Sequence, residues 1–123
     1  PVLGNINTFG GNAVCCAASL ACLQTIQSEK LMDEVERKSN LIRSLLIHPA
    51  IKKIKGKGFM FSLDFEDTDL NFEIIETCVQ NGLIVDWFLF NSHSMRIAPP
   101  LIITDDEIKK ACAIIMQSIQ LCV

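Results

Sequence analysis

The sequence lacks the charge pattern and the long apolar segments that mark several classes of protein. Its 123 residues carry a formal net charge of −3, which gives no basic footprint for nucleic acid. The apolar run at residues 13–23 is too short to cross a bilayer, which takes about 20 residues. The N-terminus has no basic region followed by an apolar segment and a cleavage site, so no signal peptide is predicted. We therefore expect neither a nucleic-acid partner nor a membrane partner.

The six cysteines lack the spacing of a disulfide framework or a metal site. They form no Cys-x-x-Cys pair and have no histidine at ligand spacing, so no metal is expected. Most of them fall in apolar helical patterns, where a free cysteine behaves as a small hydrophobic residue. This usage is typical of a reducing cytosol and predicts a cytoplasmic protein. The cysteines are Cys15, Cys16, Cys22, Cys78, Cys112 and Cys122.

The composition is that of one globular domain without internal repeats. Hydrophobic residues make up 50% of the chain and charged residues 20%, so disorder is not expected. The chain begins at Pro1 without an initiator methionine, which is how a fragment or a processed product begins. We expect it to be one of these.

The segment at residues 13–23 is apolar except for Ser19, and its pattern is apolar on every side of a helix. Such a helix has to be buried on every side. A chain of this length has little interior in which to enclose it, because it hides only about two-thirds of its surface. We expect part of its cover to come from another domain, a second subunit, or both.

The periodicity predicts alternating helices and strands. Residues 12–47 read as one long helix or two abutting helices, ended by His48-Pro49. Strands are expected at residues 51–55 and at residues 59–65, where every second side chain is apolar. The lysines of the first strand (Lys52, Lys53, Lys55 and Lys57) are expected on its solvated side.

The second half of the chain repeats this alternation. A helix at residues 70–81 ends at Gly82, and an apolar run at 83–89 is broken by the polar residues 91–94. A short strand is expected at 95–98, followed by a capping box at Thr104 that opens the last helix. The order predicts an α+β fold: a small, mostly antiparallel sheet covered by helices on one face.

Two positions are candidates for chemistry. Thr8 precedes Gly10-Gly11-Asn12 at the start of a helix, where a hydroxyl could donate to a phosphate. The alternative is a plain N-cap at Asn12 after a flexible turn. Arg96, beside the rigid Pro99-Pro100 turn, could hold a carboxylate through two parallel hydrogen bonds. The alternative is a sheet-edge arginine paired with an acidic neighbour.

Other polar residues are expected to be ordinary. Asp64 and Glu66 are interpreted as solvated charges. His48 and His93 have no companions that suggest a metal site or an acid–base pair. Trp87 and Phe88 are expected to pack in a core or an interface.

The ordered set of motifs resembles the C-terminal part of class III, pyridoxal-phosphate-dependent aminotransferases. This group contains the acetylornithine, ornithine, 4-aminobutyrate and lysine ε-aminotransferases. The motifs are Thr8-Phe9-Gly10-Gly11-Asn12, Lys55-Gly56-Lys57-Gly58-Phe59-Met60, Asn81-Gly82-Leu83-Ile84-Val85, Arg96-Ile97-Ala98-Pro99-Pro100-Leu101 and the terminal capped helix. One departure is Ala13, where the family commonly has proline.

The resemblance implies the small domain of a fold type I enzyme that forms a homodimer. Residues 1–30 would carry the phosphate-contact motif and a bridging helix, and residues 31–123 the small domain. Thr8, with Phe9 and Gly10, would reach the phosphate of pyridoxal phosphate held mainly by the other subunit. Arg96 would grip the carboxylate of an amino acid or 2-oxo acid substrate.

The resemblance also implies that the Schiff-base lysine lies upstream of this chain, since none of its lysines stands in a matching context. The chain alone is therefore expected to be inactive. Two alternatives stay open. The parent could be a non-transaminase class III relative, such as a racemase or a decarboxylase, because this half of the fold says little about the reaction. Otherwise the chain could be an independent, non-catalytic α+β binding or assembly module.

Overall fold

The computed structural model describes residues 8–123 of the chain. Its internal contacts divide it into two units, with the boundary between Met32 and Asp33. Within residues 8–123, no helix is both long enough and apolar enough to cross a membrane.

The first unit is built around helix α1 (Ala13–Ser28). Asn12 caps it, since the Asn12 side chain accepts hydrogen bonds from the backbone N–H groups of Val14 and Cys15. No residue of α1 is buried, although its sequence is apolar on every side. The cover that such a helix needs is therefore not supplied by the described part of its own unit.

A turn separates α1 from helix α2 (Val35–Leu45), so of the two predicted forms the single long helix is wrong. The turn contains Lys30 at a φ of 51°, a left-handed conformation that a helix cannot continue through. The predicted stop at His48-Pro49 holds, because α2 ends just before it.

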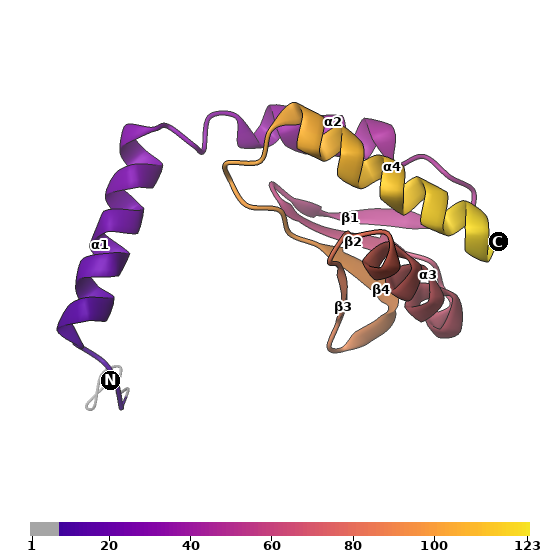
Figure 1. The fold of residues 1–123 in the computed structure, drawn as a ribbon, viewed down its shortest axis with the longest axis horizontal. Helices are drawn as coiled ribbons and strands as arrows, with labels where there is room; N and C mark the ends of the chain where they lie inside the picture. Colours follow the sequence, from indigo (N-terminus) through magenta and orange to yellow (C-terminus); the bar gives the residue numbers. More distant parts are fainter. Residues whose placement is uncertain (1–7) are drawn as a thin grey trace. The chain divides into compact units, whose positions relative to one another are not determined.

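The second unit contains a four-stranded sheet in the order β1-β2-β4-β3, with every neighbouring pair antiparallel. The strands are β1 (Lys53–Lys57), β2 (Met60–Asp64), β3 (Asp86–Phe88) and β4 (Asn91–Ile97). Helices α2, α3 (Thr68–Gln80) and α4 (Asp105–Cys122) lie over one face of this sheet (Figure 1). The α+β fold expected from the sequence is thereby confirmed.

The core lies between the sheet and these helices. The apolar face predicted for residues 59–65 is confirmed, because Phe59, Phe61, Leu63 and Phe65 are all buried. Phe61 and Leu63 belong to a cluster of buried side chains that α2, α3 and α4 complete. Residues alternate between the two faces of a strand, so Ser62 and Asp64 face away from the helices.

Several strand boundaries differ from the predicted ones. Strand β1 runs on through Gly56 to Lys57, and the run at 83–89 forms only the short β3. The polar residues 91–94, predicted as a break, form the first half of β4. They can do so because side chains of α3 form hydrogen bonds with Ser92. Asn71 Nδ2 donates to the Ser92 carbonyl at 2.7 Å, and the Thr68 and Ser92 hydroxyls are hydrogen-bonded at 3.1 Å.

Candidate functional site

A row of polar side chains crosses the sheet face that the helices of this unit leave uncovered. The strand register pairs Lys55 with Ser62, Ser62 with Arg96, and Arg96 with Asp86. Residues paired in this way project from the same face of a sheet. The fold thus brings two cations, a hydroxyl and a carboxylate from four strands into one line.

Arg96 lies in the middle of this row on β4, which is an interior strand between β2 and β3. The alternative of an arginine at the sheet edge is therefore wrong. The acidic neighbour that this alternative expected is present, and it is Asp86. Arg96 Nη2 donates to Asp86 Oδ2 at 2.9 Å, and 45% of the arginine side chain is exposed. The guanidinium group is held on one side and remains open to a ligand on the other.

Two hollows indent the same sheet face. One has a volume of about 410 Å³ and the other of about 420 Å³. The first is lined by Ser62, Phe88, Leu89, Phe90, Asn91 and Arg96, and the second by Lys55, Gly56, Lys57, Met60, Ser62 and Phe88. Their shared lining, Ser62 and Phe88, makes them neighbours. A ligand bound by Arg96 would therefore have an apolar and aromatic surface beside its charged group.

Asp64 and His93 correct the interpretation of these residues as ordinary. Asp64 is only 6% exposed. His93 Nδ1 lies 2.7 Å from Asp64 Oδ1, and Lys55 Nζ lies 3.2 Å from Asp64 Oδ2. The backbone N–H of Glu66 donates a further hydrogen bond to the same carboxylate. The prediction that Asp64 is solvated and that His93 has no companion was wrong.

The surroundings of Asp64 hold its pKa below the ordinary value of 3.8. Burial raises the pKa. Hydrogen bonds from His93, from the Glu66 N–H and from Lys55 lower it by more, so the net shift is downward. A carboxyl group with a lowered pKa stabilises the folded state above its unfolded pKa. This stabilisation is lost as the pH falls through the folded pKa.

We expect Asp64→Asn to flatten the dependence of stability on pH below about pH 4, where an unfolded aspartate takes up its proton. The measurement is urea unfolding of wild type and variant between about pH 2.5 and about pH 7. Asp69→Asn, which changes an exposed carboxylate on α3, serves as the control. Identical acid slopes for wild type and Asp64→Asn would contradict the assignment.

The Thr8 motif lies in the first unit, in a turn that covers residues 8–11 and is exposed throughout. The plain N-cap at Asn12 is confirmed, and it occupies the N–H groups of Val14 and Cys15. Gly11 has a φ of 78° and nothing within 4 Å of where a Cβ would stand, so the turn can be approached closely. A phosphate contact from the Thr8 hydroxyl stays a prediction, as does the part assigned to Phe9 and Gly10.

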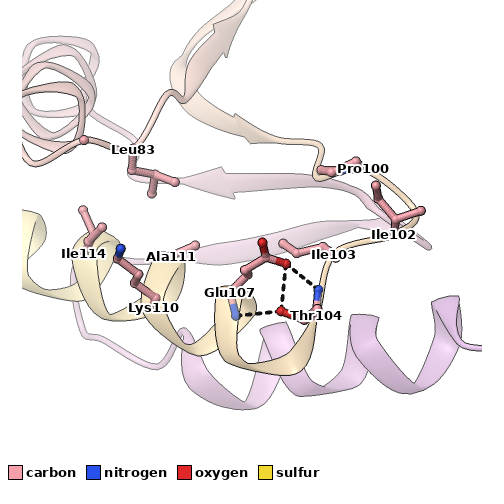
Figure 2. Close-up of a pocket in the computed structure, with 10 residues that line it drawn as sticks. Leu83, Pro100, Ile102, Ile103, Thr104, Glu107, Lys110, Ala111 and Ile114 are labelled. Atoms are coloured by element: carbon pink, nitrogen blue, oxygen red, sulfur yellow. Dashed lines mark hydrogen bonds between the residues drawn. The ribbon is translucent and has the colours of Figure 1, made fainter.

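A third hollow of about 490 Å³ lies beside the start of α4 (Figure 2). Its wall is mainly apolar, with Leu83, Ile103 and Ala111 among the lining residues. The Glu107 carboxylate in this wall accepts from the backbone N–H of Thr104 at 2.8 Å and from its hydroxyl at 2.7 Å. The predicted capping box is thus confirmed, and the Glu107 carboxylate caps the N-terminus of α4. The uncovered sheet face is the better candidate for chemistry.

Comparison with known proteins connects this geometry to one family. A family model described as Aminotransferase class-III matches residues 1–119. Acetylornithine aminotransferase of Caldanaerobacter subterraneus is 32% identical over 114 residues, which is 89% of this chain and 28% of that protein. Ornithine aminotransferase of Emericella nidulans is 28% identical over 120 residues, covering 92% of this chain and 26% of that protein. The chain thus spans little more than a quarter of the curated relatives it matches.

Solved structures agree with this comparison. The ornithine aminotransferase of Toxoplasma gondii superimposes with a TM-score of 0.82 at 30% identity, over 95% of this chain and 29% of that one. Crystals of that protein, grown with oxidised glutathione, have partial occupancy of PLP at the active site. Acetylornithine aminotransferase of Elizabethkingia anophelis gives a TM-score of 0.82 at 32% identity, over 95% of this chain and 32% of that one.

Proposed function

Because this chain belongs to the class III aminotransferase family, we propose that it is the C-terminal portion of an aminotransferase. The longer enzyme would move an amino group between an amino acid or ω-amine and a 2-oxo acid. The observation that carries the proposal is Arg96, a half-exposed guanidinium group beside a hollow on the uncovered sheet face. A carboxylate is the group that an amino acid and a 2-oxo acid share.

The proposal divides the chain between two parts of the longer enzyme. Residues 1–30 would carry the phosphate-contact motif and a bridging helix, and residues 31–123 would form the small domain. The boundary between the two contact units, after Met32, supports this division. The unburied apolar helix α1 supports a homodimer, since its cover has to come from the remaining part of the enzyme or from a second subunit. The six free cysteines suit a cytoplasmic enzyme.

The cofactor in this proposal is pyridoxal phosphate, which stabilises the negative charge that develops on the substrate carbon during amino transfer. Thr8 would donate its hydroxyl hydrogen to one phosphate oxygen, with Phe9 and Gly10 beside it. The remaining contacts to the cofactor would come from outside these 123 residues. A chain without the attachment lysine would therefore be inactive by itself.

Arg96 would bind and orient the substrate. A guanidinium group can form two parallel hydrogen bonds with a carboxylate, which fixes both the position and the rotation of the bound acid. Fixing the carboxylate fixes the neighbouring carbon, where the amino group is exchanged, at a defined place. The apolar residues Phe88 and Phe90 in the adjoining hollow would exclude water from that side of the substrate.

In the full-length enzyme, we expect Arg96→Lys to raise the KM for carboxylate substrates roughly 10- to 150-fold. Lysine keeps the charge but loses the planar pair of donors, and a charged hydrogen bond contributes about 1.5–3 kcal/mol. Steady-state kinetics with a panel of α-amino acids and 2-oxo acids measures the change. Arg37→Lys is the control, because Arg37 binds Glu34 and Asp105 outside the polar row. An unchanged KM for every carboxylate in the panel would refute the assignment of Arg96.

A further inference from the structure

We propose that Asp86 is a positioning residue, which aims the guanidinium group of Arg96 at the substrate carboxylate. The inference rests on the proposed function, because it needs a carboxylate site at Arg96. Asp86 and Arg96 are directly paired across β3 and β4, so the backbone itself places their side chains together on the uncovered face. The contact is a charged hydrogen bond of 2.9 Å between Arg96 Nη2 and Asp86 Oδ2.

Asp86 is itself held in place and so can hold another group. Its second oxygen, Oδ1, accepts a hydrogen bond from the backbone N–H of Trp87 at 2.8 Å. The Trp87 ring packs edge-to-face on Phe72 of α3, with 5.2 Å between ring centroids and 62° between planes. Trp87 therefore anchors β3 to the helix layer, while Asp86 projects from the opposite face of the same strand.

The contact also leaves Arg96 able to bind a ligand. A guanidinium group has five N–H donors. Among the described residues, Arg96 has one side-chain hydrogen bond, from Nη2 to Asp86. Arg96 lines the hollow of about 410 Å³, so its remaining donors can be reached from there. An incoming carboxylate can thus make two parallel bonds without displacing Asp86.

This arrangement lowers the entropic cost of binding. A free arginine side chain loses many rotamers when a ligand immobilises it, and a side chain already ordered loses fewer. The restraint supplied by Asp86 corresponds to roughly a 3- to 10-fold gain in affinity for the carboxylate. The charge of Asp86 also repels that carboxylate, but both side chains of the pair are about half exposed, and water and salt screen the repulsion.

The experiment compares three variants of Asp86 in the full-length enzyme. Asp86→Ala removes the contact and should raise the KM for 2-oxo acids roughly 3- to 10-fold, while kcat stays within about twofold. Asp86→Asn keeps an oxygen that can accept from Arg96 Nη2 and should return the KM to within about twofold of wild type. Asp86→Thr suits a strand and cannot reach the guanidinium group, so it replaces the alanine variant if that one fails to fold.

A second readout does not depend on turnover. Butyrate, an unreactive carboxylate, should inhibit Asp86→Ala more weakly than wild type by the same factor, whereas the neutral butyramide should not distinguish the two. Asp69→Ala, which removes an exposed carboxylate from α3, should leave both inhibitors unaffected. In an Arg96→Lys background, Asp86→Ala should cause no further rise in KM, since the planar group that it positions is gone.

The outcomes separate this inference from the proposed function. If Arg96→Lys leaves KM unchanged, the carboxylate site is wrong and the role of Asp86 is wrong with it. If Arg96→Lys raises KM and Asp86→Ala does not, only the role of Asp86 is overturned. A lower KM in both Asp86→Ala and Asp86→Asn would show that Asp86 competes with the substrate, which also overturns positioning.

Discussion

Gly56→Ala is expected to lower the free energy of unfolding by about 3 kcal/mol, the largest loss of stability for any single methyl group that we anticipate in this chain. Gly56 has a φ of 126°, a conformation that side chains rarely adopt, and a Cβ there would lie 1.9 Å from the Met60 carbonyl oxygen. Neither the Met60 backbone nor the Gly56 backbone can move easily to relieve this clash. The clashing atom is backbone of the paired strand, and the Gly56 carbonyl is held by Arg43 Nη2 at 2.7 Å. Urea unfolding of the 123-residue chain measures the loss.

Gly82→Ala is the matched control for this prediction. Gly82 also has a positive φ, 85°, but nothing lies within 4 Å of where its Cβ would stand. This variant should show the backbone strain alone, about 1–2 kcal/mol. Equal losses at the two positions would mean that the approach of β2 to Gly56 contributes nothing.

Local patterns in the sequence were sufficient to predict the parts of the fold that depend on neighbouring residues. The alternation from Phe59 to Phe65 gave the buried strand because a strand repeats every two residues. The capping box gave the start of α4 because its two hydrogen bonds join residues only three positions apart. The order of the short motifs gave the family, which the match over residues 1–119 confirms.

Contacts between distant segments explain what was missed. Asp64 is buried because β4 lies beside β2 and brings His93 to it, 29 positions away in the sequence. A distant segment also explains residues 91–94. Their polar composition predicted a break, but Asn71 and Thr68 of α3 form hydrogen bonds with Ser92 and allow a strand there. One usable signal was present, since Lys55 and Asp64 are close in sequence, on the strands predicted at residues 51–55 and 59–65.

The candidate site was predicted in the same partial way. Arg96 was recognised from the residues around it, and the structure places it on an accessible face. Its partner Asp86 was not, because only the pairing of β3 with β4 brings the two together. Thr8 lies in an exposed turn of the first unit, and the phosphate contact expected of it stays a prediction.

The 123-residue chain alone is expected to form no specific covalent adduct with pyridoxal phosphate and to have no aminotransferase activity. The chain has eight lysines, and none of them is buried. Lys38, the least exposed, donates through Nζ to the Ile103 carbonyl at 2.7 Å. A lysine that attaches the cofactor has to be desolvated or otherwise activated so that its uncharged amine is available at neutral pH. The lysines are Lys30, Lys38, Lys52, Lys53, Lys55, Lys57, Lys109 and Lys110.

Borohydride reduction after incubation with the cofactor, followed by mass spectrometric mapping, measures this prediction. We expect low, scattered labelling over the exposed lysines, because none of the eight lysines is buried. The full-length enzyme, treated in parallel, should carry one adduct per subunit at a lysine outside these residues. A single stoichiometric adduct within the chain, lost when that lysine is changed to arginine, would show that these residues hold the attachment site. That result would contradict the proposal that the attachment lysine lies outside them.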